Sequence, residues 1–310
     1  MKQILQGLGG GAMRADAWEE AAAMLCLLTR AAWSPDLPAP MTRMQVHGMK
    51  ASGALEALVL RERCKGAQME RARLLLSRVG AVCNVLERYM EQGYSVLLPG
   101  DERWPQQLYA LGAQMPLFLF ALGDCALLSG RHIAAAGSRD IRIETRRAAY
   151  GLGGKIACEG YTLVTGDARG VDAAVLRGQI ACGGRAVIVP AKPDFMALEG
   201  AKDWVGDGRL LLLCEDLPDS PFSSAKALAR NHTIYALGDM AVVAAAREGI
   251  GGSWRGAKDC LDGGFGQVMV MDEGLDDQRG CRALRALGAQ LLDMQRPFEA
   301  QLVRQTSLLI

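Results

Sequence analysis

The sequence has almost no excess of either charge and no long apolar run. Among its 310 residues, 35 lysines and arginines face 34 aspartates and glutamates, a formal net charge of +1. Binding of a polyanion would therefore depend on local basic patches. No apolar run is long enough to span a membrane. The first eleven residues carry one lysine and a brief, glycine-broken apolar run, which is too weak for a signal peptide. We expect a cytoplasmic protein with no membrane partner.

Metal-ligand and disulfide patterns are also lacking. The nine cysteines are scattered, odd in number and never spaced as C-x-x-C, and most have apolar neighbours, as in Leu25-Cys26-Leu27. The three histidines are not spaced as metal ligands. This pattern is typical of free thiols in a reducing compartment and predicts no zinc site and no cofactor.

The sequence contains none of the common hydrolytic or nucleotide-hydrolysing motifs. G-x-S-x-G, H-E-x-x-H and the Walker pattern are missing, and no G-x-G-x-x-G follows the first strand of the regular βα region. No nucleophile has an obvious base nearby in the pattern. We therefore predict a binding protein and not an enzyme.

From residue 132 onward, short apolar runs alternate with helical stretches. Runs without polar alternation are typical of parallel strands covered on both faces, which predicts an α/β fold with a doubly wound, mostly parallel sheet. Before them, residues 94–98 and 117–120 are two further strand candidates. Strands are expected at 132–137, 161–166, 185–190, 209–214, 240–245 and 267–272, and helices near 144–159, 170–182, 223–237, 253–262 and 279–288.

The N-terminal part has helical periodicity, which predicts a small helical domain over residues 1–93 and the sheet domain over 94–310. Residues 41–90 hold nine lysines and arginines against four acidic residues, with a cluster at Arg61-Glu62-Arg63-Cys64-Lys65. These charges fit either a basic arm or an ordinary solvated helix face.

Two predicted strands end in similar glycine turns. The first runs into Gly137-Ser138-Arg139, and the next into Gly166-Asp167-Ala168-Arg169-Gly170, followed by Asp172. Glycine permits a close turn, arginine can bind phosphate with two hydrogen bonds, and the helix that follows offers free N–H groups. Asp172 lies where that helix begins, so it can cap the helix or hold the facing loop. The pair of turns predicts a phosphate site.

Two later segments belong to the same edge of the expected sheet. Arg230 and Asn231 lie on a predicted helix, and Gly252-Ser253 follows the strand that ends near residue 246. In open α/β sheets, ligands bind at the carboxyl ends of the strands, where these turns converge. The only aromatic residue near a turn in this pattern is Trp254, so base stacking cannot be placed.

These segments resemble the DNA-processing protein A family, also called DprA or Smf, from about Ser95 to Leu292. The similar motifs are 97–108 (D-x-x-Y-P-x-x-L), 117–124 (P-x-x-L-x-x-x-G-D), Gly137-Ser138-Arg139 (V-G-S-R), 165–172 (S-G-x-A-x-G-I-D), Arg230-Asn231 (R-N-R) and Gly252-Ser253 (S-G-S). The resemblance implies an extended Rossmann-like domain that binds single-stranded DNA, hands it to the recombinase RecA during natural transformation, and forms a homodimer. It implies no catalysis. On this hypothesis, Arg139, Arg169 and Arg230 contact phosphates.

The chain departs from the family pattern at two positions. Leu176 stands where the family usually has histidine, and His232 stands at the second arginine of R-N-R. Two other interpretations stay open. One is a nucleotide-binding protein or phosphoribohydrolase of the lysine-decarboxylase-like group, although the glutamate of its P-G-G-x-G-T-x-x-E motif is missing after 249–254. The other is an inherited pocket with only a scaffolding role.

Overall fold

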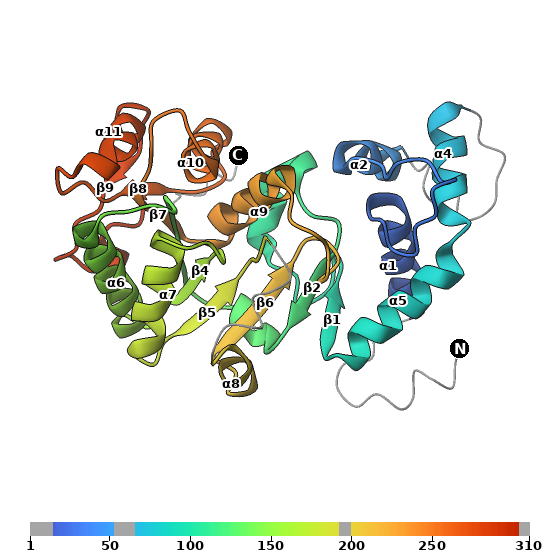
Figure 1. The fold of residues 1–310 in the computed structure, drawn as a ribbon, viewed down its shortest axis with the longest axis horizontal. Coiled ribbons are helices and arrows are strands. Elements are labelled where there is room, and N and C mark those ends of the chain that lie inside the picture. The colour runs from blue at the N-terminus through green and yellow to red at the C-terminus, as the bar shows by residue number, and fades with distance from the viewer. Residues whose placement is uncertain (1–14, 53–65, 192–199, 304–310) are drawn as a thin grey trace, which may run out of the picture. The chain divides into compact units, whose positions relative to one another are not determined.

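The computed structural model describes residues 15–52, 66–191 and 200–303 (Figure 1). Contacts divide the chain into two compact units, one of Met1–Asp101 with Leu117–Leu119 and one of Glu102–Pro116 with Phe120–Ile310. The predicted domain boundary after residue 93 stays a prediction. The basic cluster at 61–65 lies outside the described residues.

The first unit is helical, as its periodicity predicts. Its helices α2 (Arg43–Ala51), α4 (Ala67–Leu76) and α5 (Val79–Glu91) all pack against α1 (Ala15–Leu28). The buried side chain of Arg78 joins them, because it donates to the carbonyl oxygens of Thr29 (2.7 Å), Leu75 (3.2 Å), Cys26 and Ala31. Carbonyl groups at the end of α1 therefore find their partners in one guanidinium. The same unit contains the strand β1 (Tyr94–Leu97).

The second unit alternates strands and helices. Its strands are β2 (Leu119–Leu122), β3 (His132–Gly137), β4 (Thr162–Thr165), β5 (Arg185–Ile188), β6 (Leu210–Cys214), β7 (Met240–Ala245), β8 (Val268–Val270) and β9 (Gln290–Leu291). Its α-helices are α6 (Ile143–Cys158), α7 (Val171–Ala181), α8 (Ala201–Gly206), α9 (Ser224–Leu237), α10 (Gly252–Gly263) and α11 (Arg279–Ala286). In the part of the chain described, no helix combines the length and apolar character that crossing a bilayer requires.

These strands follow the order β2-β6-β5-β4-β3-β7-β8-β9 and are parallel except for β2, which pairs antiparallel with β6. The predicted α/β fold class and the six predicted parallel strands are confirmed. The antiparallel direction of β2, the short helix α8 and the two-residue strand β9 were not predicted, because such short elements carry no clear periodic pattern.

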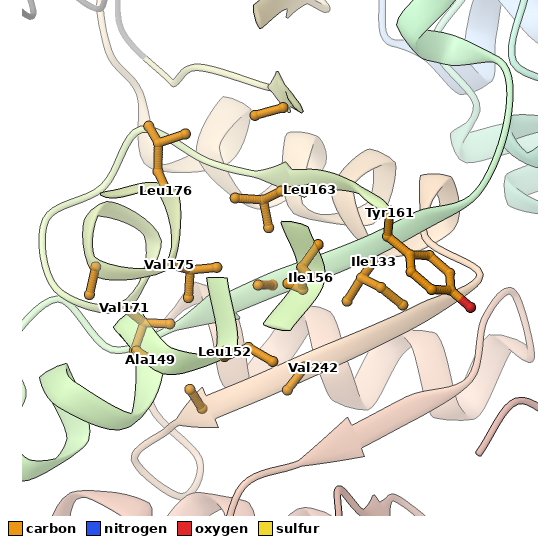
Figure 2. Close-up of a cluster of buried hydrophobic side chains, with 14 of the residues drawn as sticks. Ile133, Ala149, Leu152, Ile156, Tyr161, Leu163, Val171, Val175, Leu176 and Val242 are labelled. Atoms are coloured by element: carbon orange, nitrogen blue, oxygen red, sulfur yellow. The ribbon is translucent and has the colours of Figure 1, made fainter. Parts of the chain in front are cut away.

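Side chains that alternate along β3 face opposite layers of the fold. Ile133 points into a buried apolar cluster with α6 and α7, which lie side by side (Figure 2). Ala134, the next residue, lies against Gly238 at the end of α9, on the other face. Cluster members that Figure 2 labels include Ala149, Leu152, Ile156, Leu163, Val171, Val175 and Val242.

The strand order reverses direction at β3. The chain proceeds from β3 outward to β6 on one side, and β7 then pairs with the other side of β3. The β3–β7 register shifts between Ala136 and Gly137, at the carboxyl end of both strands. A bulge of this kind redirects the chain at the point where the two loops separate, which is where ligands bind in this class of sheet.

Candidate functional site

A cavity of about 730 Å³ opens at this switch point. Its walls come from the loop after β3, the loop after β7 and the first turns of α9 and α10. The whole cavity lies within the second unit. Its volume falls within the range of pockets for small organic ligands, about 300–1,000 Å³, so it offers more room than a single phosphate group fills.

Eight of the eleven residues predicted for the site line this cavity. They are Gly137, Ser138, Arg139, Asp172, Arg230, Asn231, Gly252 and Ser253. The other three, Gly166, Arg169 and Gly170, lie outside its lining. The predicted convergence of the turns is therefore present in the structure, and the individual residues differ in what their side chains contact.

Arg169 points to a carboxylate. Its guanidinium Nη2 lies 2.9 Å from Asp140 Oδ1, and the two side chains are 75% and 65% exposed. The sequence predicts a phosphate contact for Arg169 and not this ion pair, because Asp140 belongs to the preceding turn, after β3, and is distant from Arg169 in the sequence. A phosphate at Arg169 would have to compete with Asp140.

Arg230 is buried beneath the cavity among acidic groups. Its side chain is 7% exposed, and Nη2 lies 3.4 Å from Oδ1 of Asp167, which is 4% exposed. A Cβ atom on Gly166 would collide with this guanidinium and would lie 2.6 Å from Asp172 Oδ2. Glycine at position 166 thus makes the space for an internal charge cluster, and Arg230 serves first as the counterion of two carboxylates.

Asp172 holds the two glycine turns together. Its carboxylate accepts backbone hydrogen bonds from Gly137 in the first turn and Ala168 in the second. Burial raises the pKa of Asp172 to about 6, an effect that the charge of Arg230 and these hydrogen bonds oppose and that Asp167 reinforces. Burial penalises the charged form of a carboxyl group. At Asp172 this effect on the pKa is larger than the opposing effect of the Arg230 cation.

The backbone of the first turn is not free for a ligand at two positions. The Gly137 N–H donates to Asp172, and the Ser138 N–H donates to the Ala245 carbonyl oxygen at 2.9 Å. Within the turn itself, these two N–H groups therefore already have acceptors in the protein. Close packing explains the glycine at 170, where the backbone has a φ of +85° and a Cβ atom would strike the carbonyl oxygen of Ser138.

The N-terminus of α10 forms another wall of the cavity. Its N-cap residue Gly251 has a φ of +90° and no side chain to cap the helix. Ser253 Oγ donates to the Gly137 carbonyl oxygen at 2.8 Å, and its own carbonyl oxygen accepts from the Tyr235 hydroxyl at 3.0 Å. The first turn of α10 is thereby anchored to β3, with the positive end of its dipole at the cavity.

Three arginines at the cavity have no acidic partner within the described ranges. They are Arg139, Arg247 and Arg255. The sequence patterns did not single out Arg247 and Arg255. Arg247 comes two residues after the end of β7, as Arg139 does after β3, whereas Arg255 lies in the first turn of α10. With Arg230, four arginines line the cavity against two carboxylates, Asp140 and Asp172. The lining therefore carries a local positive excess despite the nearly neutral chain.

The two departures from the family pattern lie away from the cavity. His232 turns toward α10, where its Nε2 is 2.9 Å from Asp259 Oδ2 and its ring meets Phe265 edge-on. Leu176 is buried in the apolar cluster under α7. Neither residue lines the cavity.

The fold and the cavity define a doubly wound α/β protein with an arginine-rich pocket at its topological switch point. The family model of DNA recombination-mediator protein A matches residues 95–301. The chain belongs to this family.

Solved structures give the same assignment of fold. DNA processing protein A from Streptococcus pneumoniae is 20% identical, with a TM-score of 0.65, over 85% of this chain and 99% of that one. DNA processing protein A from Helicobacter pylori, described for its single-stranded DNA binding mode, is 23% identical, with a TM-score of 0.55, over 67% of this chain and 95% of that one. No curated protein sequence matches.

Proposed function

We propose that the cavity binds the sugar–phosphate backbone of single-stranded DNA and that the protein presents this DNA to RecA in DNA processing. The observation that carries the proposal is a group of three arginines in the lining of one cavity that have no acidic partner among the described residues: Arg139, Arg247 and Arg255. Membership of the recombination-mediator family supports the same substrate. So does the single-stranded DNA binding described for the relative from Helicobacter pylori.

The three arginines take the phosphate contacts in this proposal. Guanidinium groups bind phosphate oxygens with two parallel hydrogen bonds, and none of these three must first be released from a carboxylate of the described chain. The N-terminus of α10, with Gly252 and Ser253, adds a favourable dipole. Arg230 and Asn231 support the wall, and Arg169 is at most a secondary contact because Asp140 holds it.

The test is the salt dependence of binding to an oligo-dT strand and to a duplex of equal length. Each phosphate contact to a single strand contributes about 0.7 to the slope of log K against log salt. Replacing Arg139, Arg247 and Arg255 with alanine should therefore reduce the slope by about two. A matched variant removes Arg147, Arg177 and Arg185, which are exposed and lie outside the lining. An unchanged slope in the first variant would rule out this site.

An enzyme of the phosphoribohydrolase type has one observation in its favour. Asp172 lines the cavity, and burial raises its pKa to about 6, as is common for catalytic acids and bases. Its carboxylate is nevertheless engaged by two backbone N–H groups and faces Arg230, which favours a structural role. Incubation with nucleoside monophosphates tests this alternative, since release of free base would support it.

The partner and the assembly are parts of the same proposal. Transfer to RecA predicts that the protein speeds RecA filament formation on single strands already covered by a single-strand-binding protein. The pocket variant that lacks three arginines should lose this effect, and the matched variant should keep it. Sedimentation velocity tests the proposed homodimer. RecA acts in the cytoplasm, which is therefore the proposed location.

A further inference from the structure

An aromatic side chain stands exposed in the wall of the arginine-lined cavity. Phe222 precedes α9, lines the cavity and is 47% exposed. The backbone beside it is fixed, because Ser223 caps α9 by accepting a hydrogen bond from the Lys226 N–H at 3.1 Å. Lys226 in turn forms an ion pair with Asp216 at 2.5 Å. Phe222 is therefore held at the cavity by an anchored helix start.

The ring of Phe222 has an accessible face beside a cation. Arg139 Cζ lies 5.9 Å from the ring centroid, close to the outer limit of about 6 Å for a cation–π contact. Carbon atoms in van der Waals contact are about 3.5–4.0 Å apart, so Arg139 does not cover the ring closely. A planar group can reach the ring while a neighbouring phosphate meets Arg139.

We propose that Phe222 stacks an unpaired nucleobase of the strand whose phosphates the arginines bind. This inference rests on the proposed function and adds the group that selects single strands over duplexes. In a duplex the faces of each base are covered by its neighbours, whereas a single strand can offer a base to an aromatic ring. Since every base has such a face, this contact tolerates any sequence. The cavity, at about 730 Å³, has room for a nucleotide unit.

The test compares two strands of equal length and charge, one of oligo-dT and one with tetrahydrofuran abasic sites in place of the bases. The wild type should bind oligo-dT about tenfold more tightly, in line with one base stacked on an aromatic side chain. Phe222→Ala should bring this ratio close to one and leave the salt slope unchanged, because no phosphate contact is lost. Phe222→Trp should keep the ratio.

Two further variants separate stacking from general effects. Phe222→Leu keeps apolar area without a planar ring and should behave like the alanine variant. Tyr150→Ala removes an aromatic residue of equal exposure, 47%, outside the lining and should keep the wild-type ratio. A wild-type ratio in Phe222→Ala overturns the stacking proposal but leaves the arginine site standing. The arginine site is tested separately by the salt slope of the triple arginine variant, measured both with Phe222 and with Phe222→Ala. A reduced slope supports that site, and an unchanged slope rules it out.

Discussion

The guanidinium of Arg230 fills the space in which a side chain at Gly166 would lie. Arg230 comes from α9 and Gly166 from the turn after β4, and they meet beneath the cavity with Asp167 and Asp172. The wall of the candidate site therefore depends on a glycine that lies outside the cavity lining. This relationship makes the position of Arg230 sensitive to the smallest possible side chain at residue 166.

Gly166→Ala should destabilise the protein by about 1–3 kcal/mol, the usual cost of forcing extra volume into a packed site. The added methyl group must displace the buried guanidinium of Arg230 from its carboxylates. Urea unfolding measures this cost. Gly151→Ala is the matched control, because Gly151 lies in α6 with open space around its Cβ position. Alanine in that helix should leave stability unchanged or raise it slightly. Equal stability of both variants would contradict the packing argument.

Removal of Arg230 should be far more costly than removal of Arg169. Arg230→Ala leaves Asp167 and Asp172 buried without their cation, and breaking a buried pair in this way costs about 3–5 kcal/mol. Arg169→Ala breaks an exposed pair with Asp140, which is worth about 1 kcal/mol or less. Chemical denaturation of the two variants against the wild type gives both values. A cost of Arg230→Ala no greater than that of Arg169→Ala would show that the cluster does not need its cation.

The stability of the protein should fall as pH rises through the titration of Asp172. Its pKa is raised from 3.8 to about 6 in the folded chain, so folding takes up a proton between these values. The stabilisation is fully present below about pH 4 and is lost as the pH passes 6. The difference in unfolding free energy between the wild type and Asp172→Asn should decrease by up to about 3 kcal/mol over this range. If the difference in unfolding free energy stays constant from pH 4 to 7.5, Asp172 has its ordinary pKa in the folded protein.

Ser253→Ala should weaken the junction between α10 and β3. The substitution removes the hydrogen bond from Ser253 Oγ to the Gly137 carbonyl oxygen, at a cost of about 0.5–1.5 kcal/mol. Because the first turn of α10 then loses one anchor, we expect lower affinity for oligo-dT with an unchanged salt slope. Fluorescence anisotropy at several salt concentrations measures both quantities. A reduced slope would instead assign Ser253 a direct phosphate contact.

Much of the fold could be predicted from the sequence because its central strands are buried on both faces. Runs such as 132–137 and 240–245 are apolar at nearly every position, which few structures other than an interior parallel strand accommodate. The convergence of the turns follows from the same topology. The outer strand β9, Gln290–Leu291, does not have this pattern, and the antiparallel direction of β2 depends on its pairing with β6.

The partners of the site residues could not be predicted in the same way. Asp140 lies 29 residues before Arg169, and Asp167 lies 63 residues before Arg230, so each ion pair depends on how distant segments meet. The sequence does not single out Phe222, because no motif surrounds it and only the start of α9 brings it to the cavity. Sequence patterns located the strand ends, whereas side-chain direction decided which arginines face the cavity.

Both backbone polar groups of Gly137 are engaged by distant segments, since its N–H meets Asp172 and its carbonyl oxygen meets Ser253. The inner surface of the pocket is consequently fixed within the fold, and little chain entropy would remain to be lost there on binding a ligand. Under the proposed function, adjustment to a bound strand would therefore fall to the long arginine side chains of the lining.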